Sequence, residues 1–188
     1  MEYEPILPLR AITFQVLFLM VAITIESWIL RRRLGFGLHT SVKYTFIVNL
    51  AAVVAGWLAF LAVEPLAPAN IKAQIISYIL FDRLLLRGWT TEIGGTLFGI
   101  ALVAFFLTFF IKAKGIELIM RSDKVWKIPE KPVKPSREDR YARARLGRTE
   151  AQQALATFTD SVLQANAASF TAILLLLVLR AVAEGWTS

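Results

Sequence analysis

The chain has 188 residues, of which 56% are hydrophobic and only 19% are charged, whereas about a quarter of the residues in a soluble domain carry a charge. It contains no cysteine and a single histidine, His39, which excludes disulfides, thiolate chemistry and a multi-histidine metal site within one chain. The net charge is +7, and in so apolar a chain this excess indicates membrane orientation before it indicates nucleic-acid binding.

Four stretches are long and apolar enough to cross a membrane. A helix needs roughly 20 residues to span a hydrocarbon core about 30 Å thick, and the alternating pattern of a membrane strand is absent from them. We therefore predict an all-α integral membrane protein with four transmembrane helices, the first three in a membrane domain of residues 1–115. The predicted spans are residues 11–30, 44–63, 93–111 and 161–179.

The loop between the second and third spans is itself apolar. Pro65 and Pro68 end the second helix, and Asn70 can cap a new helix after them. Residues 70–87 are too few to span, so we expect an interfacial helix on the outer face or one packed over the mouth of the bundle, with a re-entrant segment as the other interpretation.

The region after the third span divides into two parts. Residues 116–148 form a basic segment in which three prolines alternate with Lys127, Lys131 and Lys134, a pattern typical of an extended cytoplasmic arm. Residues 149–188 begin with a Thr-x-x-Gln capping signal and contain no proline and no glycine before Gly185. They predict one long helix that contains the fourth span and protrudes from the membrane.

The basic residues predict the orientation. Sixteen lysines and arginines fall between spans one and two or between spans three and four, against five on the other side. Because short cytoplasmic loops attract positive charge, both termini are expected outside the cytoplasm. The basic residues Arg31, Arg32 and Arg33, with the three lysines of the arm, are expected at the membrane surface, so membrane lipid is an expected partner and nucleic acid is not.

Two polar residues lie inside the predicted spans at matching depths. Glu26 is about 6 Å from the inner end of the first span, and Asn49 is about 7.5 Å from the same boundary on the second. The pair could form a hydrogen bond that ties the first hairpin together, and Glu26 could be a proton or ion site. The interpretation we favour from the sequence alone is that Glu26 reaches the interface or binds the arginines of 31–33.

Small residues at helical spacing predict close helix packing. Ala52 and Gly56 lie on the second span, and Gly95 and Gly99 form a Gly-x-x-x-Gly motif at the start of the third. Such residues let helices approach closely, within one chain or between chains.

The sequence carries no motif of a known catalytic or phosphate-binding site, so we expect a protein that is not an enzyme. No cofactor is expected, although lipid could be bound.

Several short motifs carry a family resemblance. They include Leu7-Pro-Leu9, Phe14-Gln15, Ile25-Glu26, Thr40-Ser41, Asn49-Leu50, Gly56-Trp57-Leu58, Glu64-Pro65-Leu66 and the run from Gln74 to Tyr78. Over roughly residues 7–115 the chain resembles the cyanobacterial filament integrity protein family (FraC). The resemblance implies a protein of the plasma membrane at the septum between cells of a filament, which supports filament integrity and cell-to-cell exchange through septal junctions. The basic arm and the fourth span are not part of this resemblance.

Two other functions stay open at this point. The chain could be an accessory subunit of a photosynthetic or respiratory complex, in which His39, Gln15 or Asn49 would ligate a pigment, or it could be a small channel or carrier with a wet path past Glu26. In the septal interpretation we expect a homo-oligomer or a complex with other septal membrane proteins, with contacts near Gly95, Gly99 and residues 150–160.

Overall fold

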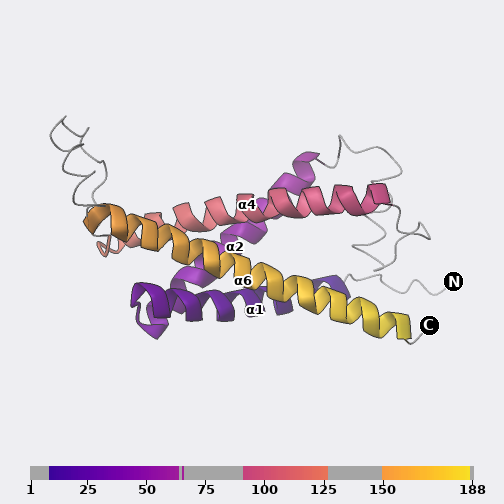
Figure 1. Ribbon diagram of the computed structural model, residues 1–188, viewed down its shortest axis with the longest axis horizontal. Coiled ribbons are helices and arrows are strands. Elements are labelled where there is room, and N and C mark those ends of the chain that lie inside the picture. Colours follow the sequence, from indigo (N-terminus) through magenta and orange to yellow (C-terminus); the bar gives the residue numbers. More distant parts are fainter. Residues whose placement is uncertain (1–8, 64, 66–90, 127–149, 187–188) are drawn as a thin grey trace, which may run out of the picture.

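The computed structural model describes residues 9–63, 65, 91–126 and 150–186, which form four long helices (Figure 1). Each helix contains an apolar stretch long enough to cross a membrane. The described part of the chain is therefore all-helical, with four helices that could each cross a membrane, as the sequence predicts. The helices are α1 (Leu9–Leu34), α2 (Leu38–Val63), α4 (Thr91–Ser122) and α6 (Glu150–Trp186).

A tight connection joins α1 to α2. Gly35 has a φ of 68°, and its N–H donates to the carbonyl of Arg31 at 3.1 Å, which closes the last turn of α1. The left-handed region favours glycine, because a Cβ in this conformation is strained against its own backbone. Two residues later the carbonyl of Gly37 accepts the N–H of Ser41 at 2.9 Å, and α2 has begun. The two helices thus form a hairpin.

The helix α4 is longer than the third predicted span. It continues 11 residues beyond Ile111, so residues 116–122, expected in the basic cytoplasmic segment, are helical. Lys112 is buried against the other helices, while Glu117 accepts from Lys114 at 2.9 Å and from Arg121 at 2.6 Å along the helix surface. These pairings satisfy the charges that ended the apolar stretch, so the helix continues past them.

The helix α6 has 37 residues and is about 55 Å long. This is the continuous helix that the absence of proline and glycine predicts. The interfacial helix expected at residues 70–87 and the proline-rich arm at 127–148 lie outside the described residues.

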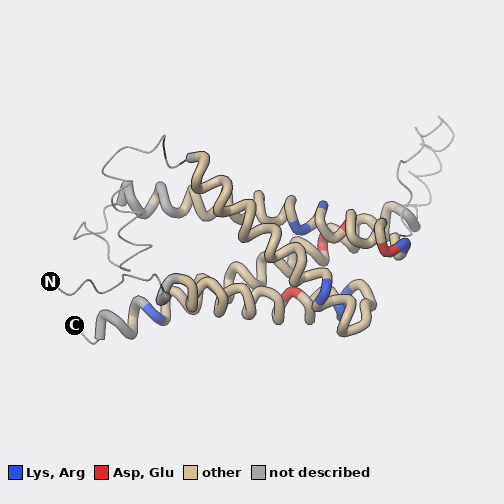
Figure 2. The backbone as a smooth tube through the Cα atoms, turned by 180° about the vertical axis from the view of Figure 1, so that it is seen from behind, with Lys and Arg blue, Asp and Glu red and all other residues tan. Residues whose placement is uncertain are grey.

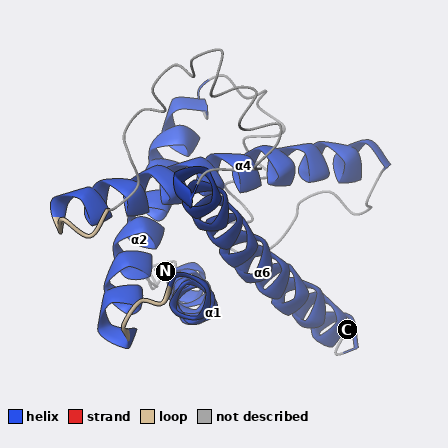
Figure 3. Ribbon diagram, turned by 60° about the vertical axis from the view of Figure 1, so that its left-hand side comes forward, coloured by secondary structure: helices blue, strands red, loops and turns tan. Residues whose placement is uncertain are grey.

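The four helices contact one another as a ring in which α1 lies against α6 and α2, and α4 lies against α2 and α6 (Figures 1 and 3). Charged residues gather in the half of the ring remote from the start of α1 and the end of α6 (Figure 2). We call this the charged half and the opposite half the apolar half. Buried side chains of the described residues lie in the charged half, within Ala22–Leu30, Ser41–Ala52, Lys112–Met120 and Phe158–Ser169.

In the apolar half the helices diverge. Figures 1 and 3 show α4 running away from α6 toward this end. Large apolar side chains are exposed here, as in Phe98 at 71%, Val103 at 69% and Leu58 at 63%. Lipid tails solvate such side chains as well as a protein core does, so the exposure carries no penalty in a membrane.

Candidate functional site

The four helices meet at a buried carboxylate. Glu26 of α1 is 2% exposed, and each of the other three helices contributes one hydrogen-bond donor to it. Asn49 Nδ2 of α2 lies 2.7 Å from Oε2, while Lys112 Nζ of α4 and Ser169 Oγ of α6 each lie 2.5 Å from Oε1. We call these four residues the Glu26 cluster.

The register of each helix places its polar residue on the buried face. Lys112 is followed by Ile116 and Met120 at intervals of four residues, and all three are buried. Because residues four apart lie on the same side of a helix, the lysine sits on the stripe that faces the bundle. Glu26 likewise lies between Ile23 and Leu30 on the buried stripe of α1.

A second set of polar contacts adjoins the cluster. The amide nitrogen of Asn49 donates its other hydrogen to the carbonyl of Thr45 at 2.9 Å. On α6, Asn166 Nδ2 donates to the carbonyl of Phe105 at 3.2 Å, and the hydroxyl of Thr108 is 3.5 Å from Asn166 Oδ1. These bonds connect α6 to α4 one to two turns before Lys112, so the polar contacts form a layer across the bundle.

The Glu26–Lys112 pair dominates the electrostatics of this layer. Both side chains are nearly inaccessible, with 3% and 7% exposure. Burying two charges is costly, and the cost is offset only when the geometry is good and further hydrogen bonds satisfy the remaining lone pairs. Asn49 and Ser169 supply those bonds. The arrangement therefore holds four helices in one register, because a shift of any helix would leave a charge unpaired or a hydrogen bond unmade.

This geometry replaces the interpretation that the sequence favours for Glu26. The carboxylate does not reach the interface and does not bind the arginines of 31–33; its bonds go to Asn49, Lys112 and Ser169. The structure brings together the two residues whose depths match, Glu26 and Asn49. Asn49 is 5% exposed, and both of its amide hydrogens are used within the chain.

Lys112 and Ser169 are members of the cluster that the sequence did not predict. Lys112 follows directly after the apolar run 93–111, so it counted as the first cytoplasmic cation. The signal that could have found it is the four-residue spacing to Ile116 and Met120, which continues the helix. Without Lys112 the basic residues divide fifteen to five, so the expected orientation does not change.

Two ion pairs tie the helices at the charged end. Arg33 of α1 lies 2.9 Å from Asp160 of α6, and Lys43 of α2 lies 3.1 Å from Asp123, just after α4. Asp123 also accepts the hydroxyl of Tyr44 at 3.0 Å. The hydrogen bond from Lys43, followed by that from Tyr44, holds the pKa of Asp123 below its ordinary value.

The basic residues expected at the surface divide into two groups. Arg31, Arg32 and Arg33 are exposed at the end of α1, and Arg33 is engaged with Asp160. The three lysines of the arm, Lys127, Lys131 and Lys134, lie outside the described residues.

The predicted packing positions mostly do not mark close crossings within the chain. Ala52 is buried, but a Cβ at Gly56, Gly95 or Gly99 would have no neighbour within 4 Å. The glycine at a close approach is Gly115, where a Cβ would lie 2.8 Å from Val48 Cγ1. Spacing alone did not reveal it, because Gly115 stands in a charged stretch with no small partner at helical spacing.

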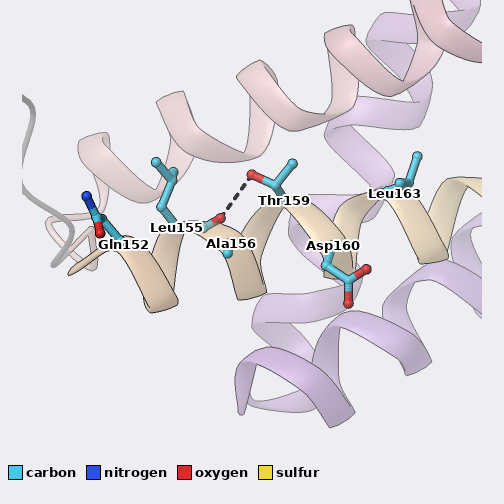
Figure 4. A pocket seen from close by; sticks show the side chains of 6 residues that line it. All are labelled: Gln152, Leu155, Ala156, Thr159, Asp160 and Leu163. Atoms are coloured by element: carbon cyan, nitrogen blue, oxygen red, sulfur yellow. Dashed lines mark hydrogen bonds between the residues drawn. The ribbon is translucent and has the colours of Figure 1, made fainter. Parts of the chain in front are cut away.

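One face of α6 carries a shallow open groove in the charged half (Figure 4). Thr159 closes a hydrogen bond to the carbonyl of Leu155 at 2.9 Å, so its hydroxyl is satisfied by its own helix. Leu155 is 47% exposed. The groove offers mainly apolar surface, and its one carboxylate, Asp160, is paired with Arg33. It is lined by Gln152, Leu155, Ala156, Thr159, Asp160 and Leu163.

A comparison with protein families identifies the chain. The family model described as "Filament integrity protein FraC" matches residues 4–179. The chain belongs to this family. The match extends well beyond residues 7–115, so the basic arm and the fourth span, which lay outside the resemblance seen in the sequence, are part of the family pattern. No curated protein and no solved structure matched the chain.

Membership gives the chain a role in filament integrity as a membrane protein with four candidate spans. The family is described by this role and not by a reaction. The Glu26 cluster fits such a role, because its ion pair and hydrogen bonds connect all four helices.

Proposed function

We propose that this FraC-family protein acts at the septum between neighbouring cells, where it supports filament integrity and cell-to-cell molecular exchange through septal junctions. The observation that carries the proposal is the family match over residues 4–179 of a chain with four candidate spans. In this proposal the protein sits in the plasma membrane with both termini outside the cytoplasm.

The proposed mechanism is assembly without catalysis. The described helices pack tightly in the charged half and diverge in the apolar half, where Phe98 and Val103 project from α4. Gly95 and Gly99 lie on the same stretch of α4 with open space where a Cβ would be. A surface of this kind supports contact with a second copy or with other septal membrane proteins, since small residues allow close helix approach in membranes.

The groove on α6 supports a second contact, at the end of the helix where the fourth span begins. It overlaps the stretch 150–160 that the sequence predicts to protrude, and it exposes Leu155 and Leu163 at 47% and 37%. In the proposal this groove faces the cytoplasm and receives a partner segment.

The location is tested with a fluorescent fusion that remains fluorescent after export, expressed at native level in filaments. We expect fluorescence concentrated at septa and slower dye exchange between neighbouring cells when the gene is deleted. Fluorescence spread evenly over internal membranes, with unchanged exchange, would contradict the septal role.

Assembly is tested separately with Gly99→Leu, which adds bulk to the open α4 surface. We expect the variant to insert and fold but to lose its higher-order complex in mild detergent. Ile100→Leu, which keeps an exposed apolar side chain on a neighbouring face, is the matched control. A wild-type protein that sediments as a monodisperse monomer would contradict assembly.

A further inference from the structure

The C-terminal end of α1 carries two adjacent exposed arginines, Arg31 and Arg32. Among the described residues neither contacts a carboxylate. Their neighbours differ: Arg33 pairs with Asp160, and Lys43 pairs with Asp123. The surplus positive charge at this end of α1 is therefore concentrated on two adjacent side chains.

An aromatic ring holds one of these arginines in place. The Arg32 guanidinium lies 5.0 Å from the ring centroid of Trp28, one turn earlier on α1. Trp28 is 58% exposed, so the stacked pair sits on the outward surface of the helix. Arg31 is three residues after Trp28 and Arg32 four, which places both guanidinium groups on the same side as the ring.

The same face continues into the membrane as an apolar stripe. Thr24 lies one turn before Trp28 on this side of α1, and Met20 and Val16 lie four and eight residues before Thr24. Met20 is 61% exposed and Val16 is 52% exposed. The hydroxyl of Thr24 donates to the carbonyl of Met20 at 2.8 Å, so it presents no unsatisfied donor to lipid. The face thus combines an apolar track, a tryptophan and a pair of cations in the order in which a phospholipid presents its chain, its interfacial region and its phosphate.

We propose that Trp28, Arg31 and Arg32 bind the headgroup of an anionic phospholipid in the adjacent leaflet. Arginine suits this role because its planar guanidinium forms paired hydrogen bonds to phosphate oxygens. The stacking on Trp28 fixes the orientation of Arg32 before a lipid arrives, so less side-chain freedom is lost on binding. This site is independent of the septal role and of assembly, because it uses a surface that neither requires.

The test compares lipid retention by the purified full-length protein in native mass spectrometry, with phosphatidylglycerol and phosphatidylcholine as probes. We expect the wild type to retain phosphatidylglycerol in preference. A cation near an anionic surface contributes about 1 kcal/mol, equivalent to about fivefold in affinity, so Arg31→Gln with Arg32→Gln should weaken retention roughly 25-fold. Addition of inorganic phosphate should not displace the lipid.

The matched control is Lys114→Gln with Lys124→Gln, which removes the same charge from two exposed lysines at the same end of the molecule. It should retain phosphatidylglycerol within about twofold of the wild type. Equal retention of the two lipids by the wild type overturns the proposal, as does an equal loss in both double variants. Displacement by inorganic phosphate overturns the assignment to a lipid and indicates a general anion site.

Discussion

Removal of the lysine from the Glu26 cluster provides the sharpest test of the structure. Lys112→Met keeps the length and apolar stem of the side chain but leaves Glu26 with only two neutral donors, Asn49 and Ser169. Removing one partner of a buried ion pair costs about 3–5 kcal/mol, because the remaining charge stays buried without compensation. We expect a loss of at least about 3 kcal/mol in the free energy of unfolding.

The neutral members of the cluster should matter less than the lysine. Asn49 and Ser169 both donate to the charged Glu26 carboxylate, and a hydrogen bond to a charged group contributes about 1.5–3 kcal/mol. Asn49→Leu and Ser169→Ala should therefore each cost about that amount, less than Lys112→Met. In the double variant Glu26→Gln with Lys112→Met, no charge is left unpaired and the glutamine carbonyl still accepts a hydrogen bond. We expect this variant to be more stable than Lys112→Met alone by about 2 kcal/mol.

The free energies can be measured by unfolding the purified protein in mixed micelles with increasing dodecyl sulfate, followed by circular dichroism. Lys114→Met is the matched control, because that side chain is 77% exposed and its ion pair among the described residues is with Glu117 on the same helix, so its loss should cost under about 1 kcal/mol. Equal losses of unfolding free energy in Lys112→Met and Lys114→Met would show that the Glu26–Lys112 pair does not hold the helices together. The same conclusion follows if the effects of Glu26→Gln and Lys112→Met on the free energy of unfolding add in the double variant.

Three further predictions concern other parts of the chain. Gly115→Ala should destabilise the protein by about 1–3 kcal/mol, since its Cβ would press on Val48, and Val48→Ala in the same chain should recover part of that loss in the same unfolding assay. The contact with Lys43 lowers the pKa of Asp123 in the folded state. It therefore stabilises the fold above the ordinary pKa of 3.8, and this stabilisation is lost as the pH falls through the lowered pKa. Asp123→Asn should remove this part of the acid dependence of the melting temperature. A cysteine introduced at Ser136 should resist impermeant thiol reagents in whole cells while one at the C-terminal residue is labelled, and equal labelling rates would reverse or abolish the expected topology.

The number of helices and their approximate limits could be predicted because hydropathy depends on composition and length, and needs no neighbour. The depth of Glu26 and Asn49 in the membrane could also be predicted, since the helical rise converts a number of residues into a distance. Both inferences use one helix at a time. The hydrogen bond between the two residues required only that adjacent spans in a hairpin lie side by side.

The remaining members of the cluster depend on the rotation of α4 and α6 about their axes, which composition does not fix. Hydropathy ended the third span at Ile111 because a lysine follows, and it gave no weight to the apolar residues at 116 and 120 that continue the buried face. The same limit applies to the small residues that predict close packing. A Gly-x-x-x-Gly motif indicates that another helix can pack closely against it. Only the positions of the neighbouring helices show that Val48 lies close to Gly115, whereas no described residue of the chain lies close to Gly99.

The two halves of the bundle follow from one physical difference. In a membrane, apolar side chains gain little from leaving lipid for a protein neighbour, so polar contacts and close packing must hold helices together. The charged half has both, in the Glu26 cluster and at Gly115. Among the described residues of the apolar half, no comparable polar layer connects α4 to the other helices, and many of its large apolar side chains are exposed. The fold can therefore be stabilised at one end while the other end exchanges lipid for a partner helix at little cost, which is the property that the proposed assembly at the septum requires.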